Sequence, residues 1–104
     1  MGVSSQQEVI DQLDREYERS GGFLGQLRAG RFDPEGAERL LSILASLTLG
    51  DDPVDRRLVQ LLWFTPIFIQ WQKERFEILG ADLDPVESIL NRVVSTLEEV
   101  VGVP

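Results

Sequence analysis

The sequence predicts an all-α protein that folds as a single-domain bundle of four main helices. Apolar residues recur at helical spacing in several segments, and Asp-Pro pairs and glycines stand at the boundaries of those segments. No stretch shows the alternation of apolar and polar residues that is typical of a strand. The 104 residues, 42% of them hydrophobic, are enough for one core without disulfides, and the chain has no Cys. We therefore expect one helical domain over 1–104.

Residues that stabilise helix ends predict where each helix lies. A Ser or Asp side chain accepts hydrogen bonds from the free backbone amides of a first helical turn, and glycine readily adopts the left-handed conformation that ends a helix. The predicted starts are Ser5, Asp33, Asp52 and Asp84, and the predicted ends are Gly21-Gly22, Gly50, Gly80 and Gly102. The predicted helices therefore cover 6–20, 34–48, 53–79 and 85–101, with a short helical turn over 23–29.

The first, second and last of these main helices each carry an apolar stripe at helical spacing, which is narrow in 6–20 and broad in 85–101. A helix with one apolar face needs a neighbour to pack on. We expect the three stripes to meet the third main helix in one core. That core is predicted to include Leu41, Leu44, Leu62, Phe68, Leu90, Val93 and Leu97.

The third main helix contains the most apolar stretch of the chain, LLWFTPIFIQW at residues 61–71. Because its apolar residues point nearly all round the helix, we interpret it as a buried spine surrounded by the other helices. The alternative is that part of the stretch is a docking surface for a partner. Pro66 lies in the middle, and proline removes a backbone hydrogen bond, so we expect a kink there or a break into 53–64 and 66–79.

The net charge of −8 argues against nucleic acid as a partner, because Lys and Arg are not clustered as phosphate contacts require. Seven acidic residues lie at predicted helix starts, where they stabilise the helix end, so much of the acidity is explained by capping. The longest apolar run is too short to span a membrane, and the N-terminus lacks the pattern of a signal peptide. We therefore expect a cytoplasmic protein that does not bind membranes.

The residue inventory predicts no enzyme, no cofactor and no metal site. The chain has no His, which is the commonest general base, and no Cys nucleophile or ligand. The stretch DDPVD at 51–55 has the spacing of a Mg²⁺-binding aspartate motif, but the second motif that such sites need is absent. The stretch DLDPVE at 82–87 lacks the glycine of a Ca²⁺ loop.

These features favour a small acidic protein-binding module, of the inhibitor or immunity (antitoxin-like) kind. Such a module would bind and block a basic partner such as a toxin or a nuclease. The sign of the charge, the lack of a catalytic set and the surplus of aromatic residues indicate this function. One alternative is a self-associating structural or adaptor subunit that forms a homodimeric bundle. A minor alternative is a metal-dependent enzyme that uses acidic residues alone.

The predicted binding surface lies on the side of the third helix that the neighbouring stripes match least. It consists of Trp63, Ile67, Gln70 and Trp71, with Arg75 stacked on Trp71 one turn later. Trp and Arg are the residue types most often found as binding hot spots.

Acidic residues are expected to steer a basic partner toward this surface. Asp11, Asp14 and Glu18 cluster on one side of the first predicted helix and would contribute if that helix lies alongside. Otherwise Glu74 and Glu77 would take that role.

Overall fold

The computed structural model describes residues 5–103, which form five helices joined by loops. The helices are α1 (Gln6–Glu16), α2 (Phe23–Arg28), α3 (Pro34–Ala45), α4 (Arg56–Ile78) and α5 (Asp84–Val101). The all-α class and the four main helices are confirmed, and α2 is the short helical turn that was expected over 23–29.

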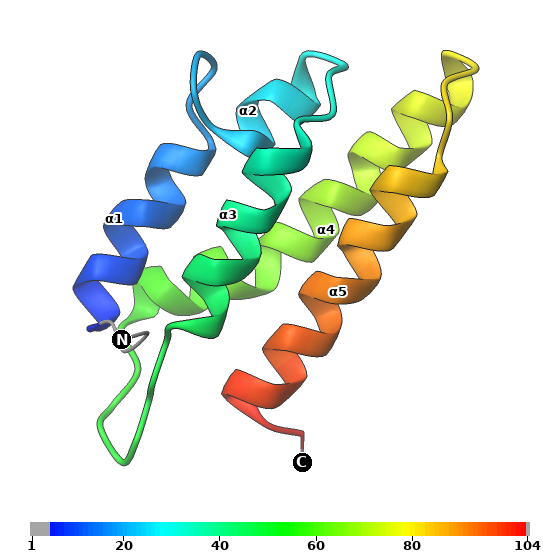
Figure 1. Cartoon of the computed structure of the whole chain (residues 1–104). Helices are drawn as coiled ribbons and strands as arrows, with labels where there is room; N and C mark the ends of the chain where they lie inside the picture. Colours follow the sequence, from blue (N-terminus) through cyan, green and yellow to red (C-terminus); the bar gives the residue numbers. More distant parts are fainter. Residues whose placement is uncertain (1–4, 104) are drawn as a thin grey trace.

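The helices α1, α3 and α5 lie side by side, α2 closes one end, and α4 crosses behind them (Figure 1). Each of α1, α2 and α5 packs against both α3 and α4, so the core lies between α3 and α4. No other described helix packs on the outer side of α4, where Val59, Trp63 and Trp71 are exposed. The interpretation of α4 as a fully surrounded spine was therefore wrong.

The N-terminus of α1 forms the capping box that its sequence predicts. The Ser5 side chain accepts a hydrogen bond from the Glu8 N–H at 3.1 Å. The Glu8 carboxylate in turn accepts one from the Ser5 N–H at 2.9 Å. Two free amides are thus satisfied by neighbouring side chains.

The start of α4 differs from the prediction, because Asp55 rather than Asp52 is the N-cap. Asp55 accepts a hydrogen bond from the Arg57 N–H at 2.8 Å. The side chain of Gln6 on α1 donates to the Pro53 carbonyl at 3.0 Å and accepts from the Asp55 N–H at 2.8 Å. These two bonds hold 53–55 as loop, so the helix begins three residues later than expected.

Asp33 and Asp84 also differ in detail from the capping that we expected. Asp33 precedes α3 as predicted, but its side chain makes no capping hydrogen bond. Asp84 is the first residue of α5 and not its cap, which is Leu83, and the Asp84 N–H donates to the Asp82 carboxylate at 3.1 Å.

Glycine ends two of the helices as predicted. Gly80 and Gly102 have φ of 75° and 91°, in the left-handed region that favours glycine. At Gly80 the N–H groups of Gly80 and Ala81 donate back to the Glu77 and Phe76 carbonyls, which closes the end of α4.

Two helix ends were placed too late. α1 ends at Glu16, with Tyr17 as its C-cap, and Gly22 is the N-cap of α2. α3 ends at Ala45, and Gly50, with φ of 56°, turns the loop that follows. In both places the glycine marks a change of chain direction but lies beyond the helix.

α4 continues through Pro66 without a break. Its first turns run at an angle to the remainder, so the helix bends (Figure 1). Pro66 offers no N–H to the Leu62 carbonyl, and the buried Thr65 hydroxyl donates to the Leu61 carbonyl at 2.7 Å. Proline and a Thr hydroxyl bonded four residues back are both known to bend helices.

Most of the predicted core is buried. Leu41, Leu44, Leu62, Phe68 and Val93 are each at most 8% exposed. Leu90 and Leu97 are only partly buried and pack on the edge of the core. Leu97 lines a hollow between α4 and α5, where the packing is incomplete.

Candidate protein-binding surface

The two tryptophans of the chain lie on the outer side of α4 and are more than half exposed. Trp63 is 56% exposed and Trp71 is 52% exposed, while Ile67 and Gln70 between them are half-buried. The buried side of α4 is formed by other positions of the helix, which include Leu58, Thr65 and Phe76. Because residues 61–71 of α4 are apolar nearly all round and are covered on one side only, part of their apolar surface faces solvent.

Phe64 supports both tryptophans from below. Its ring centroid lies 6.0 Å from that of Trp63 and 5.5 Å from that of Trp71, and both pairs are edge-to-face. Phe64 also contacts Phe68, at 6.1 Å, and Tyr17, the residue that follows α1, at 6.5 Å between ring centroids. We call Trp63, Phe64 and Trp71 the aromatic face; its exposed rings rest on a packed aromatic cluster.

Tyr17 joins the aromatic face to the backbone of α4. Its hydroxyl lies 3.3 Å from the Thr65 hydroxyl, whose own proton is donated to the Leu61 carbonyl. Tyr17 is therefore the donor in this pair. Burial raises the pKa of Tyr17 above its ordinary value of 10.0.

A groove runs between the first half of α4 and the C-terminal half of α5. Its volume is about 400 Å³, and we call it the α4–α5 groove. It is lined by Leu49, Val54, Val59, Leu62, Trp63, Pro66, Val94, Leu97, Glu98, Val101 and Gly102. Of these lining residues, Glu98 alone is charged. Trp63 belongs to the aromatic face as well, so the two features form one continuous surface.

The exposed apolar side chains of the described chain concentrate in this groove. Nine large hydrophobic residues of 5–103 are exposed, and five of them line it. These five are Val54, Val59, Trp63, Val94 and Val101. Singly exposed apolar residues are normal on a protein surface, whereas a contiguous group marks a site of interaction.

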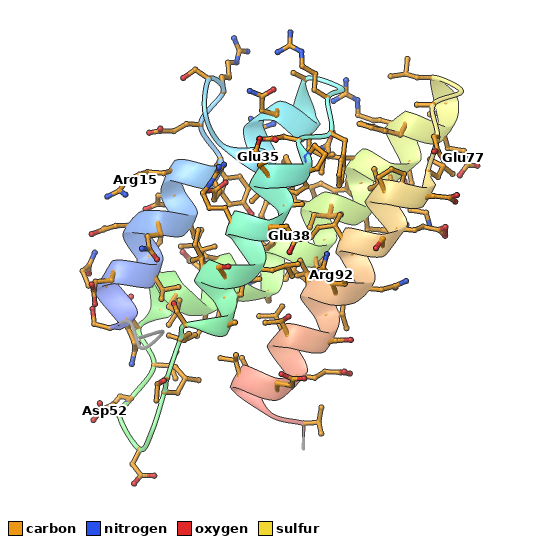
Figure 2. All side chains as sticks on the ribbon, viewed as in Figure 1. Arg15, Glu35, Glu38, Asp52, Glu77 and Arg92 are labelled. Atoms are coloured by element: carbon orange, nitrogen blue, oxygen red, sulfur yellow. The ribbon has the colours of Figure 1, made fainter. Side chains whose placement is uncertain are left out.

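Acidic residues gather where the groove approaches the C-terminal end of α5. A second hollow shares Leu49, Val54 and Val101 with the groove and is also lined by Asp52 and Glu99. The loop that carries Asp52 and the end of α5 lie at the same end of the bundle (Figure 1). Asp52 extends from the side of that loop, away from α5 in this view (Figure 2).

Ion pairs of the described residues lie outside the groove. Lys73 of α4 and Glu87 of α5 pair at 3.2 Å farther along the two helices. Arg92 and Glu38 pair at 2.6 Å between α5 and α3, where Figure 2 shows them meeting. This pairing holds the pKa of the Glu38 carboxyl below its usual value. Within 5–103, neither Glu98 nor Glu99 takes part in an ion pair.

Arg75 does not stack on Trp71, so this part of the predicted surface was wrong. Its guanidinium donates to the Arg28 carbonyl at 2.7 Å and to the Gln72 side chain at 3.0 Å. The carbonyl groups at the C-terminal end of α2 have no partner within that helix, and a cation is favoured there. Arg75 therefore joins α4 to α2.

The predicted acidic cluster on α1 is divided. Asp14 pairs with Arg57 of α4 at 2.6 Å, and Asp11 is exposed and accepts from Gln7 at 2.9 Å. Glu18 lies beyond the end of α1, in the turn that leads to α2, so the three carboxylates do not share one helix face. The alternative acids, Glu74 and Glu77, are both exposed on α4.

Sequence reasoning missed a buried ion pair at the corner of α1, α2 and α3. Glu16 is 4% exposed and accepts two hydrogen bonds from Arg39 of α3, at 2.7 and 3.0 Å. It also accepts the Phe23 N–H at 2.9 Å, and so caps α2. Glu16 stands at a position where the helical periodicity of α1 calls for an apolar residue. An acidic residue at such a position could have indicated a buried ion pair.

The two acidic motifs and the apolar helix raise questions of metal and membrane binding. Within residues 5–103, no three acidic side chains lie together in a way that could hold a metal ion. None of the helices in that range is long and apolar enough to cross a membrane.

No protein-family model, no curated protein and no solved structure matches this chain.

Proposed function

We propose that the protein is a small acidic protein-binding module of the inhibitor or immunity (antitoxin-like) kind, which binds and blocks a basic partner such as a toxin or a nuclease. The observation that carries this proposal is the exposure of Trp63 and Trp71, at 56% and 52%, on one face of one helix. A partner that covered both rings would remove a large apolar area from water.

The support beneath the rings favours a binding role. Phe64 makes edge-to-face contacts with both tryptophan rings, and these contacts restrict the motion of the rings before any partner binds. A side chain that is already ordered pays less conformational entropy when a partner covers it. Tryptophan is also among the residue types that contribute most to binding energy in protein interfaces.

The charge of the chain indicates the kind of partner. A net charge of −8 attracts basic proteins and speeds their association, and it repels acidic ones. A basic surface that binds nucleic acid or another polyanion is a suitable target, because covering it would block the partner. The same charge disfavours self-association, in which two acidic surfaces would meet.

The test is a comparison of captured proteins. The purified protein is immobilised beside a Trp63→Ser, Trp71→Ser double variant and an Ile78→Ser control, and bound proteins from a cell lysate are quantified by mass spectrometry. Ile78 is 85% exposed and lies at the far end of α4, so it controls for loss of an exposed apolar side chain. Circular dichroism checks that each variant is folded.

We expect at least one basic protein to be retained by the parent and by the control but not by the double variant. The purified partner should then lose its own activity when the parent protein is added. Equal capture by all three proteins would contradict the proposal. A homodimer in light scattering that the double variant abolishes would instead favour the self-associating subunit.

A further inference from the structure

The α4–α5 groove has an apolar floor and, at one end, acidic residues that no basic lining residue of the described chain neutralises. The side chains of Val94 and Val101 on α5 are 41% and 53% exposed and face the side of the groove formed by α4. At its end lie Glu98 in the groove and Asp52 and Glu99 in the adjoining hollow. No Lys or Arg lines either hollow in the described part of the chain.

The position of these carboxylates on α5 is electrostatically unfavourable. The C-terminal end of a helix carries partial negative charge, so basic residues are favoured in its last turn. The last turn of α5 has Glu98 and Glu99 instead, with no basic residue. A positive group that docked there would relieve repulsion both among the carboxylates and with the helix end.

We propose that the α4–α5 groove binds a basic amphipathic helix of the partner protein. The apolar side chains of that helix enter between Trp63 and Val94, and its Lys or Arg side chains lie on Glu98 and Glu99. This inference rests on the proposed function and adds the site and the chemistry of the bound segment. An amphipathic helix in an apolar groove is a recurrent mode of peptide recognition.

Charge distinguishes this occupant from a second copy of the chain. A symmetric dimer places the same surface of each subunit against the other, so a single interface would contain the acidic ends of two grooves. The groove supplies no base to neutralise them within residues 5–103. A helix with basic residues flanking its apolar stripe would cover the apolar floor of the groove and pair with the carboxylates at its end.

The probe is a synthetic amphipathic peptide of Leu and Lys, about 15 residues long so that it can form a helix. A peptide of Leu and Glu with the same pattern is the control for charge. In a Trp71→Phe background Trp63 is the sole tryptophan, and its fluorescence reports binding at the groove. The groove variants are Val94→Ser and the pair Glu98→Gln, Glu99→Gln.

A matched pair, Glu35→Gln with Asp84→Asn, changes the net charge equally at exposed positions away from the groove. We expect the Leu–Lys peptide to bind and the Leu–Glu peptide not to bind. The Glu98, Glu99 pair should raise the Kd about fivefold to tenfold, the Val94 variant should also raise it, and the matched pair should change it less than about twofold.

Equal effects of the two charge pairs would overturn the inference, because binding would then follow net charge alone. Binding of the Leu–Glu peptide, or a dimer that Val94→Ser dissociates, would overturn it as well. If the Leu–Lys peptide does not bind while the tryptophans still capture a basic protein, the groove inference fails and the proposed function stands. Loss of both results overturns both.

Discussion

The corner of α1, α2 and α3 and the surface formed by α4 and α5 differ in how far their side chains are buried and in whether their acidic groups are paired. At the corner the Glu16 carboxylate is buried with three hydrogen bonds, from Arg39 and from the Phe23 N–H. Gly22 and Gly25 pack so closely there that a Cβ atom would meet the Glu16 and Glu18 carbonyls. On the α4–α5 surface, apolar side chains are exposed, and within residues 5–103 the acidic residues at the groove end have no basic partner.

The difference separates stability from binding within one small domain. A closely packed and fully hydrogen-bonded corner tolerates change poorly, because any substitution leaves a buried group unsatisfied or a carbonyl displaced. The exposed rings of the aromatic face contribute little to the stability of the folded domain, and their apolar area remains free to contribute to association. Substitutions in the two regions should therefore have opposite effects on folding and on binding.

The largest expected effect is on the core that both regions share. Phe68 is 3% exposed and lies edge-to-face with Tyr17 at 5.4 Å, with the Arg28 guanidinium 5.1 Å from its ring. We expect Phe68→Ala to lower the free energy of unfolding by about 3–5 kcal/mol. Denaturant unfolding followed by circular dichroism measures this. A variant as stable as the parent would show that α4 packs differently.

The next effect belongs to the corner. Glu16→Ala should lower the free energy of unfolding by about 2–3 kcal/mol, because it leaves Arg39 and the Phe23 N–H without their acceptor. The value is below that of a fully buried pair because the Arg39 side chain is 45% exposed. Glu38→Ala removes an exposed pair with Arg92 and is the control. Equal losses from the two variants would contradict the contrast between buried and exposed pairs.

A smaller effect tests the loop that forms the end of the groove. Asp55→Ala should cost about 1 kcal/mol of unfolding free energy, because Asp55 caps α4. Asp52→Ala should change it by less than about 0.5 kcal/mol, because Asp52 lies in the loop as an exposed residue. Thermal and denaturant unfolding of the two variants compare them directly. The reverse order would restore the helix start that we first predicted.

The smallest effect is the pH dependence at Tyr17, which packs beneath the aromatic face. Its pKa in the folded protein is raised above 10.0 by burial, so the folded state holds the proton more tightly than the unfolded state. Stability from this group is fully present below pH 10 and is lost as the pH rises through the folded-state pKa. Tyr17 is the sole tyrosine, so tyrosinate absorbance follows it alone. A midpoint at or below 10, or the same alkaline loss in Tyr17→Phe, would contradict this.

Much of the fold was predictable because helix-end signals are local. The capping box at Ser5 and the glycine end at Gly80 depend on residues within one turn, and both were read correctly. The start of α4 was misplaced because the choice between Asp52 and Asp55 depends on Gln6, which is 49 residues from Asp55 in the chain. No local pattern contains that contact.

The candidate site was predictable in part. The exposure of Trp63 and Trp71 followed from a helix with more apolar surface than its neighbours could cover. The position of the groove between α4 and α5 was not predicted, because it depends on how far α5 lies from the first half of α4. The Glu16–Arg39 pair joins residues 23 positions apart and was missed for the same reason. The spacing of residues within one helix can be predicted from a sequence, whereas the distances between helices cannot.

The central claim is that the aromatic face is built for binding and the corner for folding. The measurement that tests it most directly is the free energy of unfolding of the Trp63→Ser, Trp71→Ser double variant, followed by circular dichroism beside Glu16→Ala. The account predicts a loss below about 2 kcal/mol in total for the double variant, because both rings are more than half exposed, and a larger loss for Glu16→Ala. A double variant that unfolds, or that loses more stability than Glu16→Ala, would show that the tryptophans hold the fold together and would contradict the account.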